Sequence, residues 1–331
     1  MPADTFLPTS ALVRAAFGDA VIAWYDTSIY PWSPVFRANL RGADGQAIDV
    51  VVKRAARTPE RVAACAAWQR HVIAAGVQAL LPVEIEGELT VAADDRTWIA
   101  YPYVTGAPWD GSIEQISTAG RALGALHRAS TSFDHPELPR FAWPEPTPES
   151  IGEDVAAIRT VCLLELPASI ANDVAARWEA EFDSFAATTL PAIRDANLPW
   201  LPVTIDHRVT NLVFSGDGDL PTVLDFENGD VAPRLLDLGH SVLLIMLEIT
   251  PNPGRLFDAA EWVAFRDAYL AEAPPLTERE RTLWPTALTY TRLEFGTWHL
   301  TEGAEWDWPG NRPFLLDLLT LDEQARFPLV D

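Results

Sequence analysis

The sequence predicts an α+β protein with two lobes. A small β-rich lobe with one main helix is expected over residues 1–103, and a larger, mostly helical lobe over residues 104–331. β-Branched runs crowd the first part of the chain, helical spacing of apolar residues dominates the remainder, and Pro102, Gly106 and Pro108 break the pattern between them. A chain of 331 residues that is 48% apolar is long enough to bury a core in each lobe.

In the small lobe we expect four strands and one helix. The strand-like runs occupy residues 35–40, 47–53, 89–91 and 97–103. The first two flank an Asp44-Gly45 turn signal, which predicts a hairpin. The helix begins with Thr58 as its N-cap and Pro59 in its first turn, and it ends before Gly76.

In the larger lobe helical spacing predicts helices over residues 113–129, 153–166, 168–190, 240–248 and 278–299. The five prolines between residues 136 and 148 predict a loop. Residues 211–214 and 222–225 are strand-like and flank a turn, so we expect a second hairpin there.

Charge and cysteine content exclude several classes of function. The formal net charge of -23 disfavours nucleic acid and anionic membrane surfaces as partners. The two cysteines, Cys65 and Cys162, are too few for a disulfide framework, which suits a reducing compartment. The first ten residues lack the basic stretch and long apolar run of a secretory signal. We therefore expect a cytoplasmic protein.

Lys53 is the only lysine of the chain, because every other basic side chain is arginine. It ends the β-branched run 49–53, where a phosphate-binding lysine would lie. A compact ammonium and a planar guanidinium are not equivalent at a phosphate. The retained lysine indicates a phosphate contact, and a surface lysine at a strand end is the alternative.

The second hairpin brings polar residues together. One strand leaves from Asn211 and its antiparallel partner returns to Asp225, so both side chains lie at the same open end. Asp206, on the preceding loop, can reach that end too. Two oxygen ligands suit Mg²⁺ bound to nucleotide phosphates, and a third carboxylate could accept the proton of an attacking hydroxyl. With a strand lysine from the earlier lobe, this set predicts phosphoryl transfer from a nucleotide.

In these parts and their order the chain resembles the aminoglycoside phosphotransferase and choline kinase-like family. Residues 204–211, Thr-Ile-Asp-His-Arg-Val-Thr-Asn, are similar to the family's His-Gly-Asp-x-x-x-x-Asn loop. Residues 223–227 are similar to its Ile-Asp-Phe element, 236–238 to its later Asp-Leu, and 123–127 to its Leu-Gly-x-Leu-His helix end. The resemblance implies a protein-kinase-like fold and a kinase that phosphorylates small-molecule hydroxyls with ATP and Mg²⁺.

The same resemblance implies a role for each matched residue. Asp206 would be the catalytic base, Asn211 and Asp225 the magnesium ligands, and Lys53 the partner of the ATP phosphates. Asp237 would be structural and brace the catalytic loop by accepting backbone hydrogen bonds.

Two departures from the family pattern bear on activity. Thr204-Ile205 stands where the family has His-Gly, and Cys65 stands where it has the helix glutamate that pairs with the lysine. Glu60 could replace that glutamate only if the helix is shifted. A kinase-fold nucleotide-binding protein with impaired catalysis is therefore one alternative, and a metal-assisted hydrolase is another.

The acceptor is predicted from acidic and aromatic residues near the C-terminus. The candidate acceptor contacts are His207, Glu227, Glu294, Trp298 and Glu302. Carboxylates beside aromatic faces attract cations, which favours an aminoglycoside or another amine-bearing metabolite. A solvated acidic surface with tryptophans in the core is one alternative reading of these residues, and a Ser or Thr hydroxyl of a small peptide is an alternative acceptor.

Overall fold

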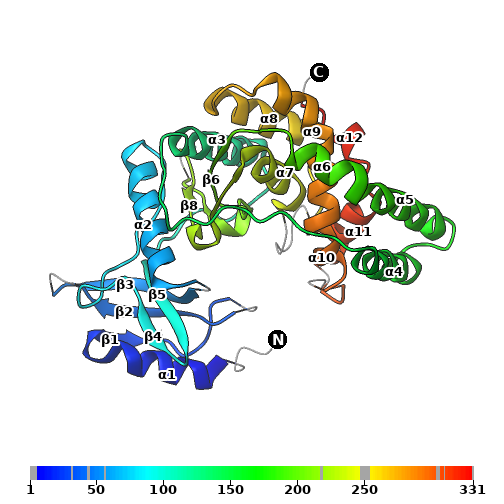
Figure 1. Ribbon diagram of the computed structural model, residues 1–331. Coiled ribbons are helices and arrows are strands. Elements are labelled where there is room, and N and C mark those ends of the chain that lie inside the picture. Colours follow the sequence, from blue (N-terminus) through cyan, green and yellow to red (C-terminus); the bar gives the residue numbers. More distant parts are fainter. Residues whose placement is uncertain are drawn as a thin grey trace.

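The computed structural model describes residues 6–30, 33–42, 45–55, 57–216, 219–246, 254–302, 306–308 and 310–329. Figure 1 shows a sheet-containing lobe below a larger helical lobe, with α2 rising from one to the other. The predicted α+β, kinase-like architecture is confirmed. No helix in the described part of the chain is long and apolar enough to cross a bilayer.

An antiparallel sheet of five strands forms the smaller lobe. Its strands lie in the order β1-β2-β3-β5-β4, with bounds Val21–Trp24 (β1), Val35–Arg41 (β2), Ala47–Ala55 (β3), Val91–Ala93 (β4) and Arg96–Pro102 (β5). Val50 and Val52 of the central β3 are buried in a cluster with Val13 of α1 (Leu7–Phe17), which η2 (Gly18–Ala20) links to β1. Because side chains alternate along a strand, Lys53 lies on the opposite face of the sheet.

The predicted first hairpin is confirmed, since β2 and β3 pair with Val35 opposite Lys53. The strand predicted at residues 89–91 lies later, as β4, because Asp94 and Asp95 form the tight turn into β5 with positive φ angles of 52° and 53°. Residues 43–44 of the first turn lie outside the described part of the chain. The helix α1 and the strand β1 were not predicted.

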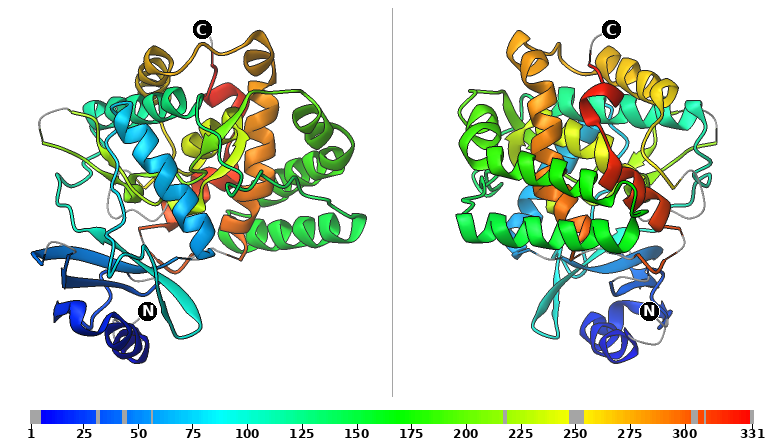
Figure 2. Two further views of the ribbon diagram at one scale, coloured as in Figure 1. Left: turned by 60° about the vertical axis from the view of Figure 1, so that its left-hand side comes forward. Right: turned by 90° about the vertical axis from the view of Figure 1, so that its right-hand side faces the viewer.

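α2 (Pro59–Ala74) begins and ends as predicted. The hydroxyl of Thr58 accepts a hydrogen bond from the backbone N–H of Arg61, and Gly76 takes a φ of 93° after the last turn. Its buried face packs mainly on the larger lobe. There the ring centres of Trp68 and Phe226 lie 4.8 Å apart, and Nε1 of Trp68 donates a hydrogen bond to the hydroxyl of Ser130. Figure 2 shows α2 crossing between the lobes, so the helix joins them.

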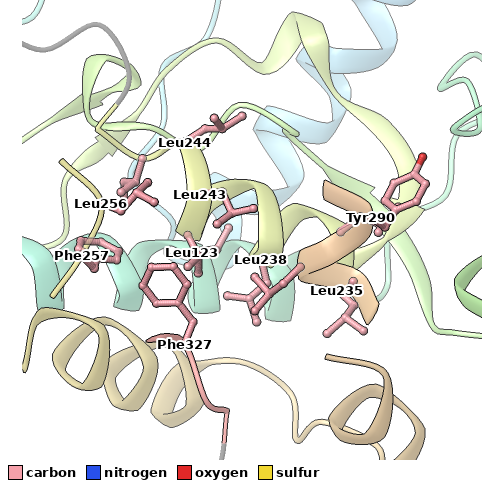
Figure 3. Packing of buried hydrophobic residues seen from close by; sticks show 14 of the residues in the cluster. Leu123, Leu235, Leu238, Leu243, Leu244, Leu256, Phe257, Tyr290 and Phe327 are labelled. Carbon is pink, nitrogen blue, oxygen red and sulfur yellow. The ribbon is translucent and has the colours of Figure 1, made fainter. Parts of the chain in front are cut away.

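The larger lobe is built from helices around one apolar cluster. Its helices are α3 (Ile113–Ser130), α4 (Pro148–Glu165), α5 (Ala171–Ser184), α6 (Leu190–Arg194), α7 (Arg234–Leu244), α8 (Ala259–Glu272), α9 (Glu278–Thr291), α10 (Thr297–Leu300), α11 (Arg312–Thr320) and α12 (Glu323–Arg326). Figure 3 shows Leu123 of α3, Leu238 of α7 and Phe327 packing together in this cluster.

Several helix bounds differ from the prediction. α4 begins at Pro148, which was assigned to the preceding loop, because Thr147 caps the helix and proline is favoured in a first turn. The predicted helices 168–190 and 278–299 each contain a π-helical turn, η3 (Phe185–Thr189) and η6 (Arg292–Gly296). α7 begins six residues before the predicted position 240, and residues 247–250 lie outside the described part of the chain.

Two short antiparallel ladders carry the loops of the larger lobe. β6 (Trp200–Val203) pairs with β9 (Asp230–Pro233), and β7 (Leu212–Val213) pairs with β8 (Thr222–Val223). The second pair is the predicted hairpin, with Leu212 opposite Val223. The short helices η4 (Val209–Asn211) and η5 (Phe226–Asn228) follow the loop after β6 and the end of β8.

Candidate active site

The loop between β6 and η4 carries Asp206. Its preceding residue, Ile205, has a φ of 51°, in the left-handed region that a β-branched residue rarely adopts. The carboxylate of Asp237 accepts the backbone N–H of Ile205 at 2.8 Å, and its other oxygen lies 2.9 Å from Nε2 of His127. Asp237 is completely buried, so this buried contact fixes the loop in spite of the strained residue.

The hairpin β7–β8 places two further oxygen-bearing side chains beside Asp206. Nδ2 of Asn211 donates to the backbone carbonyl of Asp206 at 2.9 Å. Asp225 directly precedes η5 and takes a left-handed conformation, with φ 62° and ψ 50°. The three residues that the sequence predicted to converge are therefore gathered at one end of the hairpin.

Lys53 reaches this group from the other lobe. Its Nζ lies 2.5 Å from Oδ1 of Asp225 and 3.1 Å and 3.2 Å from the two carboxylate oxygens of Glu227. Its ammonium also lies 5.5 Å from the centre of the Tyr101 ring. The lysine and the carboxylates meet although Lys53 and Asp225 lie 172 residues apart in the chain.

Burial and charge act together on these groups. Burial opposes the charge of Lys53, but Glu227 and Asp225 outweigh it and raise the pKa of the ammonium. Burial would raise the pKa of Asp225, but the neighbouring Lys53 holds it below its ordinary value. Burial raises the pKa of Glu227 to about 7, and the adjacent Asp225 acts in the same direction while Lys53 opposes both.

The position of the family's helix glutamate is occupied by a buried thiol. Cys65 of α2 is 1% exposed, and burial together with the nearby charge of Glu227 raises its pKa to about 11. Glu60 is exposed in the first turn of α2, and bonds with its own backbone N–H and with Thr58 lower its pKa. The helix is not shifted in a way that would bring Glu60 to Lys53.

Two residues beside Asp206 were missed by the sequence analysis. Nε of Arg208 lies 2.9 Å from Oδ1 of Asp206, and Nδ2 of Asn228 lies 3.5 Å from Oδ2. Arg208 lies two positions after Asp206 in the matched loop, which is the signal that could have found it. Asn228 depends on the turn η5 and carries no such signal.

A cavity of about 460 Å³ lies between the lobes at this point. Lys53, Arg208, Asn211, Asp225 and Glu227 line its polar side. Apolar side chains from both lobes line the rest, including Val35, Val51, Leu80, Tyr101, Val213 and Leu224. An apolar cavity with charged groups on one side suits a nucleotide base with its phosphates.

A second cavity of about 320 Å³ lies between α4, α5 and η6–α10. It contains three of the predicted acceptor residues, Glu294, Trp298 and Glu302. Asp154 of α4 also lines it and was missed, because α4 is distant in the sequence. Burial raises the pKa of Asp154 and of Glu294, and the neighbouring carboxylates act in the same direction to a smaller extent.

The remaining acceptor candidates lie elsewhere. His207 is 1% exposed and turned into the protein, where Nε2 lies 3.0 Å from the carbonyl oxygen of Ala119 in α3. Burial lowers its pKa to about 4. Glu227 lies at Lys53 rather than in the second cavity. In this structure His207 therefore has no access to an acceptor, because the loop that exposes Asp206 directs the next side chain inward.

Two side chains of the site have the chemistry of magnesium ligands. Asn211 and Asp225 both line the first cavity beside Lys53, and they supply the hard oxygen atoms that Mg²⁺ prefers. Among the described residues, no group of three or more His, Cys, Asp or Glu could hold a metal ion by itself. Mg²⁺ needs only one or two protein ligands when phosphates and water complete its shell, so the residues fit an ion bound with a nucleotide.

A two-lobed fold with this cavity and side-chain set defines a kinase-type phosphotransferase. The chain matches the model of the phosphotransferase enzyme family over residues 34–283. It therefore belongs to that family and is an O-phosphotransferase, a kinase whose acceptor is an alcohol group. No curated protein matches the chain.

Solved structures share the fold at low identity. An aminoglycoside phosphotransferase from Alicyclobacillus acidocaldarius is 17% identical with a TM-score of 0.59, covering 95% of this chain and 90% of that one. An amicoumacin kinase in complex with AMP-PNP, Ca²⁺ and Ami is 13% identical with a TM-score of 0.63, covering 97% and 94%. A microcompartment-associated aminopropanol kinase is 17% identical with a TM-score of 0.57, covering 96% and 97%. These likenesses concern the fold.

Proposed function

We propose that this protein uses ATP and Mg²⁺ to phosphorylate a hydroxyl group of a small, amine-bearing molecule. The observation that carries the proposal is the meeting of Lys53 with Asp225 in a nucleotide-sized cavity that Asn211 also lines, with Asp206 bonded to Asn211. The amicoumacin kinase of similar fold was crystallised with an ATP analogue and a divalent ion, which supports the choice of cofactor.

Each residue has a separate task in the proposed reaction. Lys53 neutralises the phosphates, and Asn211 and Asp225 hold the ion, which supplies charge neutralisation at the phosphates when it is bound. Asp206 accepts the proton of the acceptor hydroxyl. The hydroxyl oxygen forms a bond to the terminal phosphorus of ATP, and the bond between that phosphorus and ADP breaks. Arg208, 2.9 Å from Asp206, favours the ionised carboxylate that can accept this proton.

The second cavity supports an acceptor that carries amino groups. Glu145, Asp154, Glu294 and Glu302 line it together with Trp298, and no arginine or lysine of the described residues lines it. Thr297 also lines the cavity, and its buried hydroxyl has no hydrogen-bond partner within the described part of the chain. Carboxylates, an aromatic face and a vacant hydroxyl are the groups that an alkylammonium ion needs.

The second cavity is linked to the catalytic loop through α10. The ring of Trp298 contacts His299 at 4.9 Å. Burial lowers the pKa of His299 to about 3, and His240 and Arg208 act in the same direction. We propose that an amine in the cavity and a hydroxyl at Asp206 belong to one acceptor molecule.

Asp206→Asn tests the assignment of the base. The substitution keeps the shape of the side chain but removes the proton acceptor, so we expect kcat to fall by about 10²–10⁴-fold while MgATP binding changes little. Release of ADP and binding of MgATP are measured with the purified protein, and Asp134→Asn, exposed on the loop after α3, is the control. Unchanged turnover in Asp206→Asn would refute this role.

The acceptor is tested with amino alcohols and neutral polyols of matched size. Asp154→Asn and Glu302→Gln are expected to raise the KM of the amino alcohol about tenfold each, because each removes one charge-assisted contact, and to leave the KM of MgATP unchanged. Glu149→Gln, exposed in the first turn of α4, is the matched control. Equal turnover of neutral and amine-bearing alcohols would contradict the amine requirement.

A further inference from the structure

The lysine of β3 needs a carboxylate to fix its long side chain. In protein kinases this carboxylate is a glutamate of the helix that follows the strand, and the pair must be in place for activity. Here α2 has Cys65 at the matching position, and its first-turn Glu60 is exposed and bonded to Thr58. The helix therefore supplies no partner for Lys53, although Lys53 is ion-paired.

The partner comes from the larger lobe. Both carboxylate oxygens of Glu227 lie within 3.2 Å of Nζ of Lys53, and the side chain of Glu227 is only 5% exposed. Glu227 lies in η5, whose first residue, Phe226, is completely buried against the ring of Trp68 in α2. The glutamate is thus held between α2 and β3, next to the space that a longer acid at Cys65 would fill.

We propose that Glu227 is the positioning residue for Lys53, and that it replaces from the larger lobe the carboxylate that α2 lacks. The inference rests on the proposed function, because it assumes that Lys53 contacts the phosphates of ATP. In this role Glu227 acts on ATP binding through Lys53.

This arrangement has a structural consequence. Asp225 and Glu227 are two residues apart in one short segment, so the lysine and the proposed metal ligand are positioned by the same turn. α2 is itself fixed to the larger lobe, since Arg61 bonds to the carbonyl oxygen of Gly229 and to the carboxylate of Asp230. These contacts hold α2 against the segment that follows Glu227.

A double-mutant cycle on MgATP binding tests the inference. Glu227→Gln keeps the shape of the side chain and removes its charge, and it is expected to weaken MgATP binding about tenfold, the loss of one hydrogen bond to a charged group. In a Lys53→Met background the same substitution is expected to change the dissociation constant hardly at all, because the residue through which it acts is gone. Calorimetry on the full chain measures all four dissociation constants, and Glu60→Gln is the matched control.

The outcomes separate the inference from the proposed function. Additive effects of Glu227→Gln and Lys53→Met on the free energy of MgATP binding would overturn the inference. A higher KM for the acceptor in Glu227→Gln with unchanged MgATP binding would also overturn it, because Glu227 would then be an acceptor contact. If the wild-type protein does not bind MgATP, the proposed function fails and the inference fails with it. Should Glu227→Gln not fold, Glu227→Asp, which shortens the carboxylate, provides the same comparison and the same criteria.

Discussion

Asp237 shows how one buried carboxylate can serve both the core and the catalytic loop. It accepts the backbone N–H of Ile205 and pairs with His127, and both side chains of that pair are fully buried. Because the φ of 51° at Ile205 is costly for a β-branched residue, the loop keeps this shape only while its N–H is held.

Asp237→Ala should therefore cost stability and turnover together. The substitution leaves Nε2 of the buried His127 and the backbone N–H of Ile205 without their partner, so we expect the free energy of unfolding to fall by about 3–5 kcal/mol. Chemical denaturation and kcat are the measurements. Asp195→Ala is the control, because Asp195 pairs with Arg194 at the surface with 62% of its side chain exposed, and an exposed ion pair contributes little to the free energy of unfolding. Equal losses in both variants would contradict the bracing role.

Sequence motifs identified some site residues and missed the role of others. Lys53, Asp206, Asn211 and Asp225 were found because the family motif fixes their spacing along the chain. The contact of Glu227 with Lys53 was missed, and this side chain was assigned to the acceptor instead, because only the conformation of η5 turns it toward the other lobe.

At the scale of helices, α3 and α8 pack unusually closely. A Cβ atom on Gly120 would lie 2.4 Å from the carbonyl oxygen of Phe265, and one on Gly124 would lie 2.6 Å from that of Tyr269. Backbone atoms cannot move aside as the end of a long side chain can. The two glycines therefore set the distance between the helices, and α3 in turn supports the loop through the bond between Ala119 and His207.

Gly120→Ala is expected to destabilise the protein by about 1–3 kcal/mol, because the added methyl group forces the helices apart. Gly152→Ala is the matched comparison, since nothing lies within 4 Å of the added atom on the exposed face of α4. There alanine should stabilise the helix by about 0.5–1 kcal/mol. Thermal and chemical unfolding of both variants test the contrast, and a loss in Gly152→Ala as large as in Gly120→Ala would refute it.

Elements with strong local signals were predicted closely. The caps and first-turn proline of α2 define that helix without help from the rest of the fold, and the hairpin β7–β8 follows from its turn. The beginning of α7 was misplaced by six residues, because the residues before position 240 lie between apolar neighbours and become helical through packing. The π-helical turns η3 and η6 line the second cavity, and no local pattern announces them.

For the whole molecule, buried histidines link folding to pH. Burial lowers the pKa of His207 to about 4, of His240 to about 4 and of His299 to about 3. The unfolded chain takes up these protons near pH 6.5, so between about pH 6.5 and 4 it binds more protons than the folded chain. Each histidine thus contributes stability that is complete above pH 6.5 and is lost as the pH falls.

His207→Gln should make unfolding less sensitive to acid. Glu227, with its pKa raised to about 7, acts in the opposite direction over part of this range, so the difference between variant and wild type is the quantity to measure. That difference in the free energy of unfolding should change by about 1.4 kcal/mol per pH unit between about pH 6.5 and 4, and should be constant above pH 7. If the free energies of unfolding of the variant and the wild type differ by the same amount at every pH from about 4 to above 7, the lowered pKa is wrongly assigned to His207.

The helix α2 packs into the apolar cluster of the larger lobe. Residues Ala64, Trp68 and Val72 of α2 belong to the same apolar cluster as Leu123 of α3 and Phe226 of η5. The division at residue 103 remains a prediction about the chain, whereas the packing of α2 joins the lobes into one structure. This joining holds Lys53 over the hairpin of the larger lobe.

The amino-acid sequence by itself determined the helices and hairpins with strong local signals, the lysine that stands alone and the spacing of the catalytic loop, because caps, turns and motifs act over a few residues. Only the tertiary structure decided which carboxylate holds Lys53, that His207 faces inward and that Asp154 joins Glu294 and Glu302 around a cavity. Those contacts join segments that are far apart in the chain, and their geometry depends on the packing of every helix between them.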